Sequence, residues 1–183
     1  MEQEEIDTMY LREAYKLAMQ SPDPSTQNGA IIVRQNNLFS VNKENVIGVG
    51  FNCFPKRFAV TSKRMERPQK YSYIEHAERN AVFNAAELGK STKGGIMYVP
   101  WFACADCGRA IIQVGIKEVI GSTFPEKWWK ETRTEEDGAK NWYDSRGHAI
   151  EMFDESGIVC RWVDGPIDKN IEILFDGKKR NPF

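Results

Sequence analysis

The sequence predicts a single three-layer α/β domain, and three observations support that expectation. Short apolar runs alternate with longer segments in which apolar residues recur at helical spacing. This alternation is typical of a sheet that helices cover on both faces. The length of 183 residues suits one domain, and the chain contains neither an internal repeat nor a low-complexity tract. We therefore expect one domain over residues 1–183.

The first half of the chain predicts two helices and two strands. A helical stripe of apolar residues runs from Ile6 to Ala18 and ends at prolines 22 and 24, which cannot continue a helix. The apolar runs 30–33 and 46–51 predict buried strands. A long helix follows, because apolar residues share one face from Ile74 to Leu88 before Gly89 closes the pattern.

The second half continues the alternation. Strands are predicted at 96–99, 118–120 and 158–160, with a weaker one at 171–175. One helix lies between the first two strands, with apolar residues on one face up to Val114, and it ends at Gly115. Another is expected over 142–155, before Gly157.

Composition and charge exclude several classes of protein. Lys plus Arg is 25 and Asp plus Glu is 26, so the net charge is −1, which disfavours a surface built to bind phosphate backbones. Hydrophobic residues at 41% and charged residues at 28% indicate a folded globular chain. No apolar run approaches the roughly 20 residues of a membrane span. The acidic first ten residues do not resemble a signal or transit peptide, so we expect a cytoplasmic protein.

Two segments have unusual compositions. A predicted basic loop at 56–70 holds six basic residues and one acidic residue, a net charge of +5 that leaves −6 for the rest of the chain. A predicted Trp-rich loop at 122–146 contains Trp128, Trp129 and Trp142. We interpret its aromatic side chains, Tyr143 included, as packing residues in preference to a lid or a stacking platform for a base.

Two short motifs together predict a catalytic zinc site. The motif His76-Ala77-Glu78 opens one predicted helix, and Cys104-Ala105-Asp106-Cys107 opens the next. Residues three apart share a helix face, so both thiols can reach one ion. With the imidazole they make three zinc ligands, which leave the fourth position open for water, as in catalytic sites. Glu78 is then placed to take a proton from that water and to return it to a leaving group.

The same pattern, His-x-Glu followed by Cys-x-x-Cys, is the signature of zinc base deaminases, although Ala103 stands where that signature has proline. Three other interpretations remain open. A thiol redox protein also places C-x-x-C at a helix start, but it gives His76 and Glu78 no role. A non-catalytic zinc-binding module leaves Glu78 unexplained. A deaminase acting on tRNA or single-stranded DNA would be expected to carry a larger basic surface.

Four segments carry a more specific resemblance. They are SPDPSTQNGAIIV at 21–33, GFNCFP at 50–55, EHAERNAVFNAA at 75–86 and CADCGRAIIQVGI at 104–116. Together they resemble the deoxycytidylate (dCMP) deaminase branch of the cytidine deaminase superfamily. The resemblance implies a three-layer α/β/α sandwich with a central five-stranded mixed sheet. It also implies hydrolytic deamination of a cytosine deoxynucleotide, a homo-oligomer that is often a hexamer, and in some members regulation by deoxynucleoside triphosphates.

The resemblance also assigns roles to individual residues. Asn52 would hydrogen-bond the sugar, and the backbone around Ala77 and Cys104 would hold the edge of the base. Glu78 would protonate N3 and the departing amine beside a zinc ion bound by His76, Cys104 and Cys107.

The expected substrate is dCMP or a 5-modified dCMP. We include a modified base because Pro100 occupies a position where Thr or Ser is frequent in the family, and this change would alter the wall near the base. A 5′-phosphate needs cationic donors, and the basic loop begins just after Asn52. We therefore expect Lys56 or Arg57 to contact the phosphate.

Overall fold

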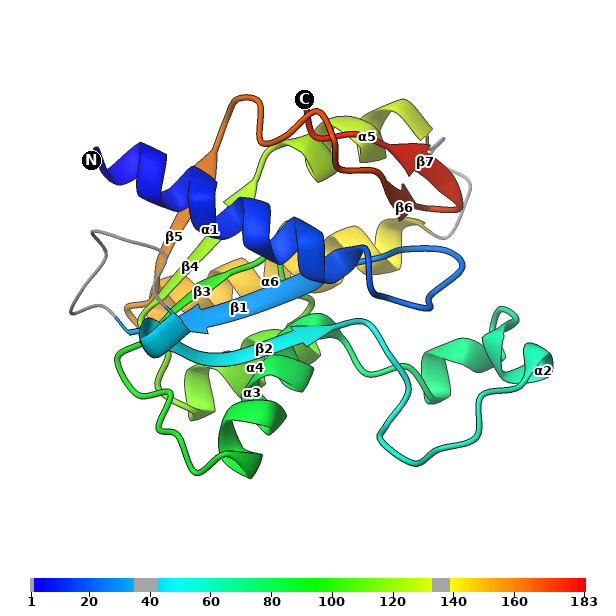
Figure 1. Cartoon of the computed structure of the whole chain (residues 1–183), viewed down its shortest axis with the longest axis horizontal. Coiled ribbons are helices and arrows are strands. Elements are labelled where there is room, and N and C mark those ends of the chain that lie inside the picture. Colours follow the sequence, from blue (N-terminus) through cyan, green and yellow to red (C-terminus); the bar gives the residue numbers. More distant parts are fainter. Residues whose placement is uncertain (1, 35–42, 133–138) are drawn as a thin grey trace.

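A computed structural model describes residues 2–34, 43–132 and 139–183. Its centre is a five-stranded sheet in the order β2-β1-β3-β4-β5 (Figure 1). Strand β1 pairs antiparallel with both of its neighbours, while β3, β4 and β5 are parallel, so the sheet is mixed as expected. The strands are β1 (Gly29–Val33), β2 (Val46–Phe51), β3 (Ile96–Tyr98), β4 (Glu118–Ser122) and β5 (Val159–Val163).

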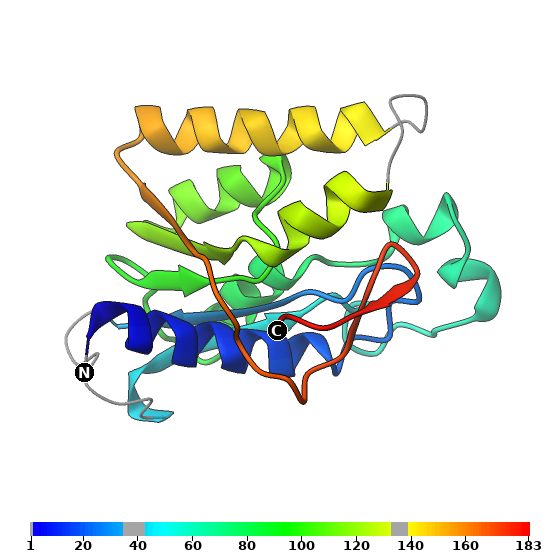
Figure 2. The ribbon, with the colours of Figure 1, turned by 90° about the horizontal axis from the view of Figure 1, so that it is seen from above.

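Helices cover both faces of this sheet, which confirms the three-layer prediction (Figures 1 and 2). One face packs against α1 (Gln3–Ala18) and α5 (Phe124–Thr132). The other packs against α3 (Ala77–Glu87), α4 (Ala105–Gln113) and α6 (Ala139–Glu155), with α6 alongside α4. Among the described helices, none is both long and apolar enough to cross a membrane.

The apolar runs of the strands follow from this double covering. In β1, Ile31 and Val33 join the core on the α1 side, whereas Ala30 and Ile32 join the core on the α3 side. Successive side chains of a strand point to opposite faces, so a sheet buried on both faces needs an apolar residue at every position.

The segment at 56–70 is mostly irregular in the structure. It contains the single-turn helix α2 (Ser62–Met65) and the beginning of the 3-10 helix η3 (Gln69–Ser72). A second 3-10 turn, η2 (Lys43–Asn45), leads into β2.

The prediction of a Trp-rich loop over 122–146 is wrong where the structure describes that segment. Residues 124–132 form α5 and residues 139–146 begin α6, while residues 133–138 and the side chain of Trp142 lie outside the described part. Trp128 and Trp129 are only 5% and 8% exposed and pack into the α1-side core. Their burial stabilises a short helix, and Pro125 is tolerated because it lies in the first turn.

The weaker strand predicted at 171–175 exists in part but does not join the main sheet. Strand β6 (Ile173–Phe175) pairs with β7 (Lys178–Arg180) in a separate hairpin. The hairpin is held to the loop before β1, because Gln27 N donates to Leu174 O at 2.8 Å and Leu174 N donates to Gln27 Oε1 at 2.8 Å.

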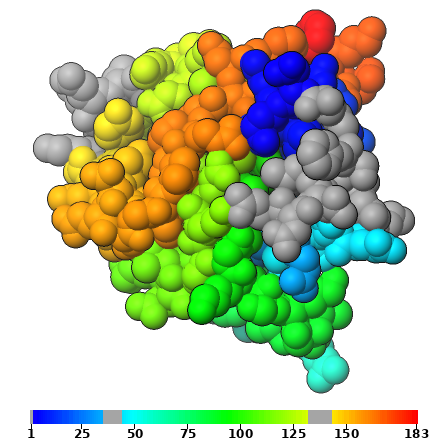
Figure 3. Space-filling model, turned by 90° about the vertical axis from the view of Figure 1, so that its left-hand side faces the viewer, coloured from blue at the N-terminus to red at the C-terminus, as the bar shows by residue number. Residues whose placement is uncertain are grey.

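The direction of the strands places two helix starts at one edge of the sheet. Both β2 and β3 run antiparallel to β1, so they are parallel to each other. The chain that leaves β2 leads to α3, and the chain that leaves β3 leads to α4. In Figure 1 this edge is on the right, and the 56–70 segment extends beyond it. Figure 3 shows the opposite end, where the orange side chains around β5 and the blue ones of α1 form much of the surface.

Two glycines of β2 allow α3 to lie against the sheet. A Cβ atom on Gly50 would lie 2.4 Å from both Ala77 O and Ala81 N, and one on Gly48 would lie 2.3 Å from Ala81 O. These are backbone atoms that cannot move aside without displacing the helix. The first turn of α3 therefore depends on glycine at these positions.

We predict that Gly50→Ala lowers the free energy of unfolding by roughly 1–3 kcal/mol, because the added methyl group forces α3 away from β2. Urea denaturation measures the change. Gly147→Ala is the matched control: a Cβ there would meet no atom of the described residues within 4 Å, so the same substitution in α6 should stabilise the protein by up to about 1 kcal/mol. Equal stabilities for Gly50→Ala and the unmodified chain would contradict the close approach.

Candidate functional site

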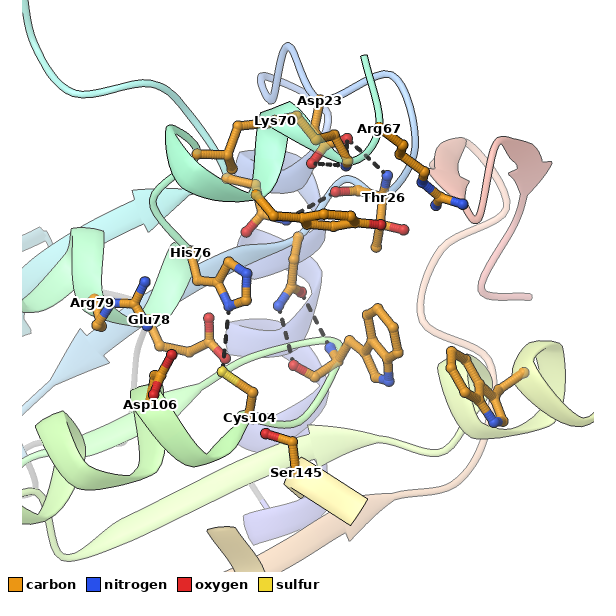
Figure 4. A pocket seen from close by; sticks show the side chains of 16 residues that line it. Asp23, Thr26, Arg67, Lys70, His76, Glu78, Arg79, Cys104, Asp106 and Ser145 are labelled. Carbon is orange, nitrogen blue, oxygen red and sulfur yellow. Dashed lines mark hydrogen bonds and ion pairs between the residues drawn. The ribbon is translucent and has the colours of Figure 1, made fainter. Parts of the chain in front are cut away.

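Two helix starts bring one imidazole and two thiols together. His76 directly precedes α3, Cys104 directly precedes α4, and Cys107 lies in the first turn of α4. The Nδ1 atom of His76 is 3.5 Å from Sγ of Cys104 (Figure 4). The same atom is 3.5 Å from Sγ of Cys107. All three possible ligand atoms lie within 4.8 Å of one another.

This spacing fits a zinc ion. Zinc–sulfur bonds of ~2.3 Å and zinc–nitrogen bonds of ~2.0–2.1 Å in a tetrahedron place N and S ligand atoms about 3.6 Å apart. The observed separations of 3.5 Å match that edge. One imidazole and two sulfurs also form the donor set of an open, three-ligand site.

The electrostatics of the two thiols suit a cation. A hydrogen bond from Cys107, acting against burial and helped by His76, lowers the pKa of the Cys104 thiol to about 4. The same hydrogen bond, together with burial, raises the pKa of Cys107. A metal ion binds cysteine as the thiolate, so metal binding at this cluster would release thiol protons.

Glu78 lies beside these ligands with an unsatisfied carboxyl group. The residue is 3% exposed, and its Oε2 atom has no hydrogen-bond partner among the described residues. A buried polar atom without a partner costs free energy. Burial also raises the pKa of Glu78 to about 7. Figure 4 shows the carboxyl group next to His76 and Cys104.

These groups open onto a cavity of about 630 Å³. Of the residues predicted from the sequence, Asn52, His76, Glu78 and Cys104 line it, and Cys107 is fully buried behind them. The cavity is also lined by Asp23, Thr26, Asn28, Arg67, Lys70, Arg79, Trp101 and Trp129.

Asn52 ties the cavity wall to the start of α3. Its Nδ2 donates to Thr26 O at 2.8 Å, and its Oδ1 accepts from Ala77 N at 2.9 Å. The backbone N–H of Ala77 is therefore already paired, and Ala77 does not line the cavity. That N–H group is thus not available for the edge of a base, and the contact expected from the backbone around Ala77 and Cys104 stays a prediction.

The structure does not bring Lys56 or Arg57 to the cavity. The Lys56 ammonium pairs with Glu87 near the end of α3, and Arg57 is exposed. The cations that line the cavity are Arg67, Lys70 and Arg79. The concentration of positive charge at 56–70 predicted a phosphate-binding segment. The path of its backbone determines which of its cations face the cavity.

Each of these three cations has a different environment. Lys70 Nζ is buried and bonded to both carboxylate oxygens of Asp23. Arg79 donates to Glu75 Oε1 at 2.5 Å and to Cys107 Sγ at 3.6 Å, so it faces the candidate metal ligands. Arg67 is half-exposed and pairs with Asp176 of the C-terminal hairpin at 2.9 Å.

Two tryptophans form an aromatic wall of the cavity: Trp101, which the sequence analysis missed, and Trp129, which it interpreted as a packing residue. Trp101 and Trp129 both line the cavity, with ring centroids 5.7 Å apart. The backbone of Trp101 is fixed by Asn28, whose Nδ2 donates to Trp101 O at 3.1 Å and whose Oδ1 accepts from Trp101 N at 3.2 Å. Flat aromatic surfaces suit a planar ring as ligand.

The sequence shows similarity to known proteins over most of this region. Residues 4–123 match the family described as the cytidine and deoxycytidylate deaminase zinc-binding region. An uncharacterised deaminase from the luxG 3′ region of Aliivibrio fischeri is 32% identical, over 81% of this chain and 85% of its own length. Human deoxycytidylate deaminase is 36% identical over 61% of this chain, and the match spans 61% of the human protein.

A solved structure shares the fold. The dCMP deaminase of the cyanophage S-TIM5, in complex with dCMP and dUMP, aligns with a TM-score of 0.59 over 88% of this chain and 98% of its own. The two sequences are 19% identical, so the comparison supports the fold alone.

We predict that the purified chain binds one zinc ion per molecule, measured by elemental analysis of extensively dialysed protein. His76→Ala and Cys104→Ser should each lose most of the metal, because each removes one of three ligands. Cys160→Ser is the matched control, since this half-buried cysteine lies on β5, away from the cluster. Full zinc occupancy in both ligand variants would contradict the site.

Proposed function

The chain belongs to the cytidine and deoxycytidylate deaminase family, and on that premise we propose that it deaminates dCMP, or a 5-modified dCMP, hydrolytically to the uracil nucleotide and ammonia. The observation that carries the proposal is the buried, unpartnered carboxyl oxygen of Glu78 beside the His76, Cys104 and Cys107 cluster. A purely structural metal site has no use for that carboxyl group.

The chain's own residues divide the chemistry between them. His76, Cys104 and Cys107 would hold a zinc ion, which when bound supplies an activated water molecule. Glu78 would take a proton from the nucleophilic water and give it to N3 of the base, which keeps it in the uracil product. Glu78 would then carry the second proton of that water to the departing amine, which leaves as ammonia. Its burial keeps bulk water from competing for that proton.

Other residues orient the substrate. Trp101 and Trp129 offer flat surfaces at the cavity wall for a pyrimidine ring. Asn52 uses one N–H and one acceptor position of its amide for Thr26 and Ala77, and an amide offers two of each. The remaining N–H and lone pair of Asn52 suit a sugar hydroxyl.

Arg67 is our candidate for the 5′-phosphate contact. Of the three cations that line the cavity, Lys70 is neutralised by Asp23, and Arg79 is engaged by Glu75 and Cys107. The Arg67 guanidinium has five N–H donors, of which Asp176 uses one. Figure 4 shows Arg67 on the far side of the cavity from Cys104, so a nucleotide could extend from the metal cluster to this side chain.

Homo-oligomer formation, a triphosphate effector and a cytoplasmic location remain predictions from the sequence and its resemblance. None of them enters the chemistry proposed above.

A substrate panel tests the function. Ammonia release is measured with dCMP, 5-substituted dCMP, dCTP, CMP, cytidine, a guanine compound, a single-stranded oligodeoxynucleotide and tRNA. We expect dCMP or its 5-substituted form to have the highest kcat/KM. Glu78→Gln should retain zinc and lose at least about 10²-fold in kcat, because proton transfer is removed. Turnover that survives this substitution, or a preference for a polynucleotide, would contradict the proposal.

A second prediction concerns the phosphate. Arg67→Ala should raise KM for dCMP by about 10–100-fold, the loss expected for one hydrogen bond to a charged group. The same variant should change KM for deoxycytidine little. Lys56→Ala and Arg57→Ala serve as comparison variants. If Lys56→Ala or Arg57→Ala raises KM for dCMP but not for deoxycytidine, and Arg67→Ala does not, the phosphate contact lies at Lys56 or Arg57, as the sequence predicts.

A further inference from the structure

We propose that the buried ion pair between Lys70 and Asp23 positions Asn52 and the first turn of α3. On this view Lys70 is a positioning residue for Glu78 and His76, although it is not expected to touch the reacting atoms. The catalytic part of this inference rests on the proposed function, whereas its structural part stands without it.

The pair is unusual in its burial. Lys70 Nζ lies 2.6 Å from Asp23 Oδ1 and 2.8 Å from Oδ2, and both side chains are 4% exposed. The desolvation cost of burying two charges can exceed their attraction, so such a pair is weak evidence for added stability. What it supplies here is a fixed separation between two segments 47 residues apart in the sequence.

One route from this pair to the site runs through the loop before β1. Asp23 Oδ1 also accepts from the backbone N–H groups of Ser25 at 2.7 Å and Thr26 at 3.2 Å, which shapes a turn. The carbonyl of Thr26 then accepts from Asn52, and Asn52 accepts from Ala77 N. These contacts are direct hydrogen bonds, and the last one is made by Ala77, which lies between His76 and Glu78 in the sequence.

A second route runs along the chain from Lys70 itself. Its carbonyl accepts from the N–H groups of Tyr73 at 3.0 Å and Ile74 at 2.9 Å. The next residue, Glu75, pairs with Cys53 in both directions, at 2.8 and 3.1 Å. The backbone carbonyl of Lys70 thus holds the segment that leads into α3. Its ammonium group holds Asp23 in the loop that contacts Asn52, so Lys70 connects the two segments.

Removing the ammonium group should therefore loosen the site without removing a metal ligand. Asp23 would be left as an uncompensated buried charge and would draw water into the cavity wall. The turn at 23–26 would then no longer hold Asn52 in place. Misplacement of catalytic groups by about 1 Å can reduce turnover as much as 10²-fold.

The test compares three zinc-loaded variants of the full chain. Lys70→Met should lower kcat/KM for dCMP roughly tenfold or more at unchanged zinc content, and Lys70→Arg, which keeps the charge, should recover part of the loss. Lys63→Met is the matched control, because this exposed lysine of the same basic segment does not line the cavity. Hydrogen exchange should become faster at the amides of Thr26 and Ala77 in Lys70→Met, and stay unchanged in β3 and β4.

Wild-type kcat/KM together with unchanged exchange at Thr26 and Ala77 would overturn the inference, even if Lys70→Met melts at a lower temperature. If that variant does not fold, Asp23→Asn/Lys70→Met removes both charges and leaves none unpaired. A kcat/KM within about threefold of wild type in the double variant overturns the inference, and a larger loss with zinc retained supports it. If the unmodified chain does not deaminate dCMP, the proposed function fails, and the exchange rates alone decide the positioning role.

Discussion

The site depends on the direction of two strands. Because β2 and β3 both run antiparallel to β1, the chain leaves them at the same edge of the sheet, and α3 and α4 begin close together. His76 and Cys104 each stand immediately before a helix, so their side chains meet in front of the sheet edge. A ligand cavity outside the carboxyl ends of strands is a general property of open α/β sheets. Here Gly48 and Gly50 let the first of these helices lie directly on the sheet.

Around this meeting point the protein buries several charged or chargeable groups, and their pairing decides what each can do. Arg79 forms an ion pair with Glu75, and Lys70 forms one with Asp23. Their charges are therefore balanced within the protein. Glu78 is as buried as Lys70, each being 3% exposed, but it keeps one carboxyl oxygen without a partner among the described residues. Unsatisfied buried groups are rare in folded proteins, and a catalytic role is one explanation for such a group. The paired cations Arg79 and Lys70 therefore have a structural role in the site, whereas the unpaired carboxyl oxygen of Glu78 is available for chemistry.

Much of this arrangement follows from the sequence, and the remainder depends on tertiary structure. Apolar runs located the five strands of the sheet, and helical periodicity located α1, α3 and α4. The signal was strong because β1, β3 and these helices bury apolar side chains. The metal cluster was predictable because its spacing within α4 is local and His-x-Glu opens the preceding helix. Trp128 and Trp129 misled the loop prediction, since aromatic and charged residues together resemble an exposed segment until a core is present to bury them. The inward turn of Arg67 and Lys70 was not predictable, because it depends on contacts with Asp176 and Asp23 that lie far away in the sequence.

We propose that two thiolates and one imidazole hold an open zinc site. X-ray absorption at the zinc edge of the loaded protein measures the number and type of zinc neighbours. We expect two sulfur neighbours at ~2.3 Å and two lighter neighbours, one imidazole nitrogen and one oxygen, at ~2.0–2.1 Å. A shell closed by four sulfur and imidazole ligands, or a shell without sulfur, would contradict it.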